Sequence, residues 1–206
     1  MVIYSESFEE HLEHIRLVLD RLRQAGLTVK PQMIVFANQE ISFLGHLVSP
    51  GCVRIDPERR RPIRDFPIPQ GTKGLARFIG MVNFYHKFVP RFADVAAPLN
   101  ALRKKEMRFV WGQKEQEDFE ALKRAISQSP LLGMANFSEK FILQTDASGT
   151  ALGAVLSQER NGVRETIAYA SRTLSAQERN ASSTYDLECL AVLFGTEKRR
   201  ASRLHS

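Results

Sequence analysis

Three β-prone segments followed by a helix constrain the fold of this sequence more than any other feature. The segments are residues 141–145, 151–157 and 166–171, all rich in apolar and β-forming side chains. Asn161-Gly162, a dipeptide typical of tight hairpin turns, separates the last two. Apolar residues recur at helical spacing after Ser183, where we expect a helix to start. The pattern predicts an antiparallel β-β-β-α unit in which the helix packs on the sheet.

The first half of the sequence predicts a helix and then a β-rich stretch. Ser7 and Glu10 are spaced as a capping box, and they predict a helix over about residues 7–25. Two apolar, β-prone runs follow, from Met33 to Phe36 and from Ile41 to Val48. We expect them to form a hairpin whose turn lies at residues 37–40.

Helix-start and helix-breaking residues divide the next segment. Asp56-Pro57 is an N-cap followed by proline at the first helical position. Pro62 is expected to kink or shorten that helix, and residues 66–71 end it. Apolar spacing predicts two longer helices, over about residues 72–88 and 113–128. Together with the β-β-β-α unit, these elements predict an α+β fold with a domain boundary near residues 105–135.

Charge and cysteine content limit the class of protein. The chain has 29 Lys+Arg and 23 Asp+Glu, a net charge of +6, which fits either a polyanionic partner or a solvated basic surface. Two cysteines cannot build a disulfide framework. No apolar run approaches the roughly 20 residues of a membrane span, and the N-terminus lacks a signal-peptide layout. We therefore expect an intracellular protein, in the cytoplasm or nucleus, with no membrane partner.

The peptide best suited to chemistry is Gln144-Thr145-Asp146-Ala147-Ser148. Asp146 directly follows a β-prone run, and the small residues after it leave room around its carboxylate. Because the helix of a β-β-β-α unit packs on the sheet, Glu188 could lie beside Asp146. Two carboxylates there would bind Mg²⁺, a cation that prefers oxygen ligands. The alternatives are that Asp146 forms a turn and that Glu188 is an exposed helix residue.

Longer stretches resemble the Pol polyproteins of gypsy-type LTR retrotransposons, in unbroken order over residues 2 to about 198. The segments FILQTDASGTALGAVLSQERNG and YDLECLAVLFG are similar to the first half of the ribonuclease H domain of that family. SFEEHLEHIRLVLDRLRQAGLTVKP resembles the palm helix that follows the polymerase active site, and ISFLGHLVSPGCVRIDPE resembles the primer-grip hairpin. LARFIGMVNFYHKFVPRFADVAAPLNAL resembles the thumb, and FVWGQKEQEDFEALKRAISQSPLL the connection.

The resemblance implies a division of the chain and a chemistry. The implied parts are the end of the reverse transcriptase palm with the primer grip (residues 1–55), the thumb (56–104), the connection (105–135), a partial ribonuclease H-like domain (136–200) and a divergent tail (201–206). The parent family performs RNA-directed DNA synthesis and cleavage of RNA–DNA hybrid, both with Mg²⁺. The implied partner is therefore RNA–DNA hybrid or duplex nucleic acid.

The resemblance also assigns roles to individual residues. Asp146 and Glu188 correspond to the first two metal-binding carboxylates of ribonuclease H. The implied primer grip consists of Phe43, Leu44, Gly45 and His46. Three consecutive basic residues at the start of the thumb, Arg59, Arg60 and Arg61, either contact a phosphate backbone or form a solvated face.

The family pattern also raises an expectation about activity. In the family, the polymerase Asp-Asp pair would precede residue 1, and two further ribonuclease H carboxylates would follow the last residue. We expect the chain to bind nucleic acid weakly and to be catalytically incomplete, unless a parent polyprotein or a second chain completes a site. Two other hypotheses stay open: a non-enzymatic module that binds a protein partner, and a product that folds only partly.

Overall fold

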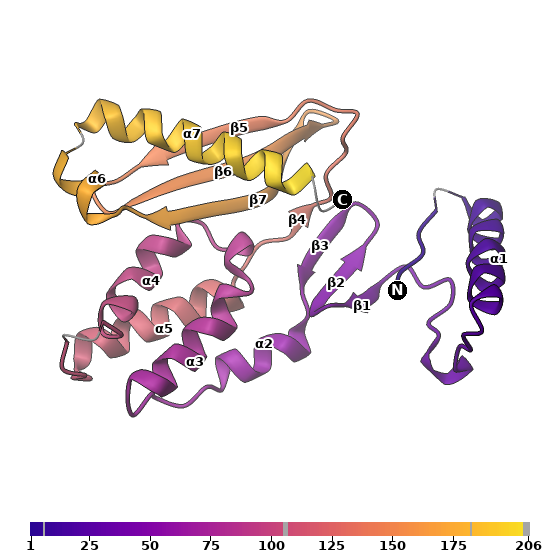
Figure 1. Cartoon of the computed structure of the whole chain (residues 1–206), viewed down its shortest axis with the longest axis horizontal. Helices are drawn as coiled ribbons and strands as arrows, with labels where there is room; N and C mark the ends of the chain where they lie inside the picture. The colour runs from indigo at the N-terminus through magenta and orange to yellow at the C-terminus, as the bar shows by residue number, and fades with distance from the viewer. Residues whose placement is uncertain (6, 105–106, 182, 204–206) are drawn as a thin grey trace.

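The computed structural model describes residues 1–5, 7–104, 107–181 and 183–203, and it has a mixed helix and sheet architecture (Figure 1). The helices are α1 (Phe8–Gln24), α2 (Pro57–Arg64), α3 (Thr72–Asn83), α4 (Phe92–Ala101), α5 (Gln113–Ser127), α6 (Ala176–Ala181) and α7 (Thr184–Arg203), with 3-10 turns η1 (Pro31–Met33) and η2 (His86–Phe88). The strands are β1 (Ile41–Phe43), β2 (His46–Ser49), β3 (Cys52–Ile55), β4 (Leu132–Gly133), β5 (Ile142–Ala147), β6 (Ala151–Arg160) and β7 (Val163–Thr173). The predicted α+β class is confirmed.

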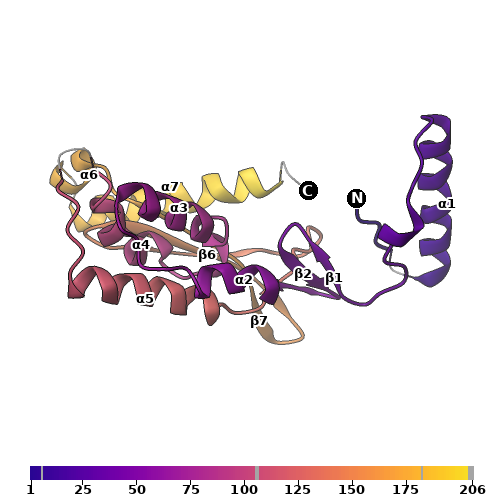
Figure 2. The ribbon, with the colours of Figure 1, turned by 90° about the horizontal axis from the view of Figure 1, so that it is seen from below.

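Helix α1 begins as the capping pattern predicts and stands apart from the rest. The Ser7 hydroxyl accepts a hydrogen bond from the Glu10 amide at 3.2 Å, which satisfies one of the amides that a helix start leaves unpaired. None of its residues is buried. Figures 1 and 2 both show α1 separated from the other helices.

The first hairpin differs from its prediction. Residues 34–36 are not a strand, and the turn lies at Leu44-Gly45, between β1 and β2. Both turn residues have positive φ, 48° and 80°, as the tight turn matched to strand twist requires. The apolar run from Ile41 to Val48 therefore folds back on itself at Leu44-Gly45, where Gly45 adopts the positive φ at no steric cost.

Helices α2 to α5, with η2, form one unit, which we call the helical module (residues 57–127). Asp56 caps α2 by accepting the Glu58 amide at 3.0 Å, and α2 is short, as Pro62 predicted. The fully buried side chains of its core include Ile63, Leu75, Phe78, Val82, Phe88, Leu99, Phe119, Leu122 and Ile126, and Ile55 of β3 belongs to the same cluster. Each contributes about 1.5–3 kcal/mol by leaving water, so this module holds the largest core of the protein.

Two helices of that module differ from the sequence prediction. The helix expected over residues 72–88 ends at Asn83 and continues as the 3-10 turn η2. Helix α4 was not predicted, because Pro98 lies inside it and proline usually marks a helix boundary. The helix expected over residues 113–128 is confirmed as α5.

Strands β5, β6 and β7 form an antiparallel meander, as predicted, and with α6 and α7 they make up the C-terminal unit (residues 142–203). Apolar side chains of α7 pack on one face of this sheet, including Ala191 and Phe194 against Leu143 and Leu152. The helical module packs on the other side, where η2 and α4 contact β7. Figure 1 shows the sheet lying between α7 and the helical module.

The chain between the two units is fixed by β4 and by one buried side chain. Leu132 of β4 pairs with Val53 of β3, so this segment joins the first sheet. Gln158, which is fully buried, then bonds both main-chain polar groups of Asn136. These contacts fix the path by which the chain enters β5. In the described part of the chain, no helix combines the length and apolarity that crossing a bilayer would take.

Candidate nucleic-acid interface and carboxylate groove

The tip of the first hairpin carries the four residues predicted as a primer grip. Leu44 is exposed at the tip (73%). The Gly45 carbonyl accepts the Asp56 amide at 3.2 Å, which ties the tip to the start of α2. A Cβ atom on Gly45 would lie 3.0 Å from the Tyr85 hydroxyl oxygen. The turn therefore sits directly on the corner that follows α3.

The ring of His46 packs against the aromatic side chains of this corner, and its contribution is packing rather than charge. Its ring lies 5.4 Å from the ring of Phe88 and 5.8 Å from that of Tyr85, measured between centroids. Burial, and then the nearby Lys87 cation, lower the pKa of His46. The neutral imidazole is therefore favoured near pH 7, and His46 contributes packing at the tip of the hairpin.

The three consecutive arginines of α2 have three different surroundings. Arg59 is exposed, and its Cγ atom would lie 3.7 Å from a Cβ on Gly45, so it flanks the hairpin tip. Arg60 turns inward and donates to the Ser127 carbonyl at 3.1 Å, at the end of α5. Arg61 lies 3.7 Å from the Asp65 carboxylate. Of these three, Arg59 is the cation adjacent to the turn.

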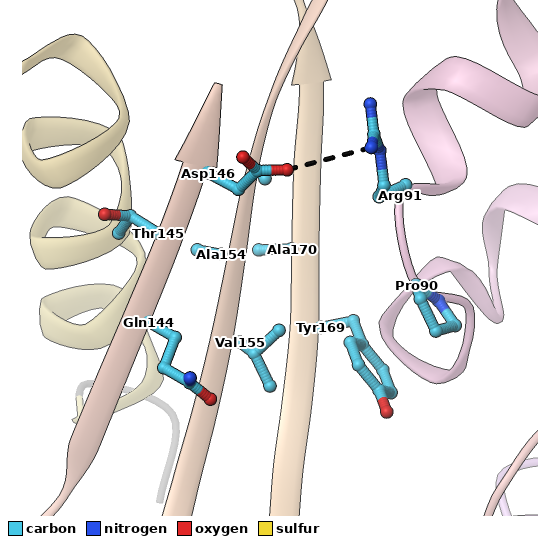
Figure 3. A pocket seen from close by; sticks show the side chains of 10 residues that line it. Pro90, Arg91, Gln144, Thr145, Asp146, Ala154, Val155, Tyr169 and Ala170 are labelled. Carbon is cyan, nitrogen blue, oxygen red and sulfur yellow. Dashed lines mark ion pairs between the residues drawn. The ribbon is translucent and has the colours of Figure 1, made fainter. Parts of the chain in front are cut away.

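Asp146 lies in a groove between β5–β7 and the start of α4 (Figure 3). The groove has a volume of about 300 Å³, and Gly153 and Ala154 of β6 are among its lining residues. Asp146 pairs in register with Gly153, so no neighbouring side chain crowds the carboxylate from that strand. Across the groove, Arg91 Nη1 lies 3.7 Å from Asp146 Oδ2. Arg91 was not predicted, and no local sequence pattern marks it.

The sheet directs Asp146 away from α7. Adjacent strand residues point to opposite faces, and Thr145 and Leu143 face α7, where they would contact a Cβ on Gly195 at 3.0 and 3.1 Å. Figure 3 shows Thr145 directed toward the helix and Asp146 toward Arg91. Glu188 lies on α7 and is exposed. The sequence suggested that Glu188 lies beside Asp146, but Glu188 is not among the described residues that line the groove.

The described residues bring a single carboxylate into the lining of the groove. Two Mg²⁺ ions need several carboxylates aimed at one point. Asp146 is the one carboxylate among the residues that line the groove in the described part of the chain, and a guanidinium faces it. In the same described ranges, no cluster of three or more metal-ligating side chains forms. The charged side chains that line the groove as described are thus one anion, Asp146, and one cation, Arg91.

Comparison with known proteins relates the chain to retroelement polyproteins. Residues 111–202 match the family model described as an RNase H-like domain found in reverse transcriptase. The chain is 39% identical over 198 residues to the retrovirus-related Pol polyprotein from transposon 297 of Drosophila melanogaster, covering 96% of this chain and 18% of that protein. It is 32% identical over 194 residues to the transposon Tf2-3 polyprotein of Schizosaccharomyces pombe, covering 94% of this chain and 14% of that protein. The chain thus spans a fifth or less of these two relatives.

Solved structures support the same fold. A foamy viral protease-reverse transcriptase in complex with RNA/DNA hybrid superimposes with a TM-score of 0.82 at 21% identity, over 95% of this chain and 27% of that chain. The same kind of protein in complex with dsDNA gives a TM-score of 0.80 at 23% identity, over 98% of this chain and 42% of that chain. The arrangement of hairpin, helical module and C-terminal unit is therefore shared with these chains.

Proposed function

We propose that this chain, a homologue of retrotransposon Pol polyproteins with an RNase H-like domain of the reverse transcriptase kind, binds RNA–DNA hybrid or duplex nucleic acid through the sugar-phosphate backbone. We also propose that the parent polyprotein is that of a gypsy-type LTR retrotransposon. The parts are the palm end with the primer grip at residues 1–55, the thumb at 56–104, the connection at 105–135, a partial ribonuclease H-like domain at 136–200 and a divergent tail at 201–206. Contacts of this kind are independent of base sequence and weaken as salt rises.

The observation that carries the proposal is the position of Arg59 beside the hairpin tip. Arg59 is exposed, and its aliphatic stem flanks Gly45, next to the exposed apolar side chains of Leu44 and Phe84. A cation beside apolar groups fits a backbone phosphate together with its sugar. The net charge of +6 adds a long-range attraction for polyanions.

Catalysis is the part of the family chemistry that we do not assign to this chain acting alone. Asp146 and Glu188 are the residues that would take part in holding Mg²⁺, by resemblance. The neighbour of Asp146 in the groove is Arg91, and a guanidinium competes with a metal for a carboxylate. We therefore propose binding without turnover, with a parent polyprotein or second chain as the source of further carboxylates.

The same partner implies an intracellular setting, in the cytoplasm or the nucleus. Cys52 and Cys189 are unpaired, which fits the reducing conditions of those compartments.

A second candidate function rests on a different surface. Large apolar side chains in the first 36 residues are exposed, among them Phe8, Leu12, Leu27, Val35 and Phe36. An exposed apolar surface of this kind favours a protein partner. On this alternative the chain is a non-enzymatic interaction module derived from a retroelement, and nucleic acid would not bind.

The test compares two arginines of one helix. Fluorescence anisotropy with a labelled RNA–DNA hybrid measures the affinity of the wild type, Arg59→Ala and Arg61→Ala. Loss of one phosphate contact in Arg59→Ala should weaken binding and lower the salt slope by about one. Arg61→Ala removes the same charge away from the turn and should change affinity less. Equal effects of the two substitutions, or no binding by the wild type, would contradict the proposal.

A further inference from the structure

The first turn of α4 is bonded to three separate segments of the C-terminal unit. The Asp94 carboxylate accepts hydrogen bonds from the hydroxyls of Thr150 at 2.7 Å and Ser148 at 3.3 Å, in the turn between β5 and β6. The Ala93 amide donates to the Ser171 hydroxyl of β7 at 2.9 Å. Arg91 reaches Asp146 of β5. One helical turn thus contacts all three strands or their connections.

This helix start lacks a cap of its own. Arg91 stands at the N-cap position in a left-handed conformation, with φ of 50°, and its side chain does not cap the helix. The first amides of a helix have no intrahelical acceptor. Ser171 supplies an acceptor for the Ala93 amide from another part of the protein. The Ala93 amide at the start of α4 therefore has its acceptor when the helical module is docked on the C-terminal unit.

Asp94 is the centre of these contacts. Its side chain is only 24% exposed, and Arg91 Nε also donates to it at 2.9 Å. Arg91 in turn faces Asp146. The carboxylate of Asp94 therefore orders both the turn at residues 148–150 and the arginine that lines the groove.

We propose that Asp94 is a positioning residue that docks the helical module on the C-terminal unit and so sets the groove that Asp146 lines. Pro90 and Arg91 form the wall of that groove contributed by the helical module, and β5 to β7 form the rest. These two residues lie three and four positions before Asp94, so the position of this wall depends on the contacts that Asp94 makes with the C-terminal unit. Nucleic-acid binding in this groove rests on the proposed function, whereas the docking does not.

Amide hydrogen exchange tests the docking without nucleic acid. Two reporter amides are Ala93, which donates to Ser171, and Leu174, which donates to the Thr150 carbonyl. Asp94→Ala should raise their exchange rates about tenfold, because charge-assisted hydrogen bonds are lost. Asp65→Asn removes a carboxylate from an exposed pair within the helical module and should leave both rates unchanged. Unchanged rates in Asp94→Ala would overturn the proposal.

A milder variant, Thr150→Val, tests the proposal even if Asp94→Ala fails to fold. Thr150→Val removes the shortest hydrogen bond to Asp94 and keeps the size of the side chain. If Asp94 and Thr150 act together, the double variant should raise exchange at Leu174 no more than Asp94→Ala alone. Additive effects would show that Asp94 acts elsewhere, and would overturn the assigned role.

Hybrid binding tests the consequence for the groove. Asp94→Asn removes a negative charge, so simple electrostatics predicts tighter binding of a polyanion. A displaced groove wall predicts the reverse, a several-fold weaker affinity for a labelled RNA–DNA hybrid at fixed salt. If Asp94→Asn binds the hybrid as well as or better than the wild type, while the reporter amides exchange faster, Asp94 does not set the position of the groove wall. Absence of binding by the wild type would instead overturn the proposed function and, with it, the role of the groove, while the exchange result would still decide the docking.

Discussion

The side-chain amide of Gln158 forms hydrogen bonds with both the main-chain N–H and the main-chain carbonyl of Asn136. Its amide nitrogen donates to the Asn136 carbonyl at 2.7 Å, and its side-chain oxygen accepts the Asn136 amide at 2.8 Å. The side chain is fully buried. A fully buried amide is stable only when its polar groups are paired, so this contact secures the segment that leads from the first sheet into the second.

Replacement of Gln158 by alanine should therefore destabilise the protein strongly. Two main-chain groups lose their partners, and the cost is about 2–4 kcal/mol. Urea unfolding, followed by circular dichroism, measures it. Gln144→Ala is the matched control, because Gln144 is exposed on β5, and its effect should stay within about 0.5 kcal/mol. Similar midpoints for the two variants would contradict the role of the contact.

Gly45 and Gly51 offer a matched pair for the hairpin tip. Both have positive φ, 80° and 76°, but a Cβ on Gly45 would meet Tyr85 at 3.0 Å and a Cβ on Gly51 would meet nothing within 4 Å. Gly51→Ala should lower the free energy of unfolding by about 1 kcal/mol, because alanine resists the positive φ at this position. Gly45→Ala should cost more, and Tyr85→Phe should recover part of the difference. Equal unfolding free energies would show that the hairpin tip is not packed on Tyr85.

Glu178 predicts a pH dependence of stability. Paired hydrogen bonds from Arg172 at 2.7 and 2.8 Å, then the Ser175 amide, lower the pKa of Glu178 from 4.5 to about 2. Because the folded-state pKa lies below the unfolded value, the stabilisation is present above about pH 4.5 and is lost as pH falls toward 2. Thermal melts should show Glu178→Gln less stable than wild type at pH 6, with the difference shrinking by pH 2. A difference that stays constant over this range would contradict the assignment.

The Arg91–Asp146 pair predicts opposite effects of two substitutions on hybrid binding without metal. Asp146→Asn removes an anion from the groove and should tighten binding about two- to fivefold, as expected for one exposed charge near a phosphate. Arg91→Met removes the cation and should weaken binding by a similar factor. Anisotropy in EDTA measures both. Both side chains are more than half exposed, so each substitution should change stability by less than about 1 kcal/mol. If the two substitutions both tighten or both weaken hybrid binding, the nucleic acid binds outside this groove.

Local sequence signals predicted the elements that depend on local chemistry. The Ser7 cap, the Asp56-Pro57 helix start and the Asn161-Gly162 turn each involve residues close in sequence. The meander and its helix were predicted because strand and helix periodicities differ clearly. The first hairpin was misplaced because its turn puts Leu44 at a positive φ, a conformation that no local preference of leucine indicates.

The candidate site was predictable only in part. Asp146 was identified from its place near a strand end, but its partner Arg91 lies 55 residues earlier and follows a proline without any pattern. Likewise, a row of three arginines looks uniform in the sequence, whereas Arg60 turns to the end of α5 and Arg61 to Asp65. The pairing of β3 with β4 was also missed, since two residues are too few to produce a strand pattern. These features depend on tertiary contacts between distant segments.

The central claim is that the chain binds RNA–DNA hybrid through its backbone and does not cleave it alone. The most direct measurement titrates the purified chain into two labelled hybrids of unrelated sequence, at about 50 and 200 mM salt with Mg²⁺, and then resolves the RNA on a gel. The account predicts equal affinity for the two sequences, clear weakening at the higher salt, and intact RNA. Absence of binding, binding that depends on sequence, or Mg²⁺-dependent cleavage that Asp146→Asn abolishes would contradict it.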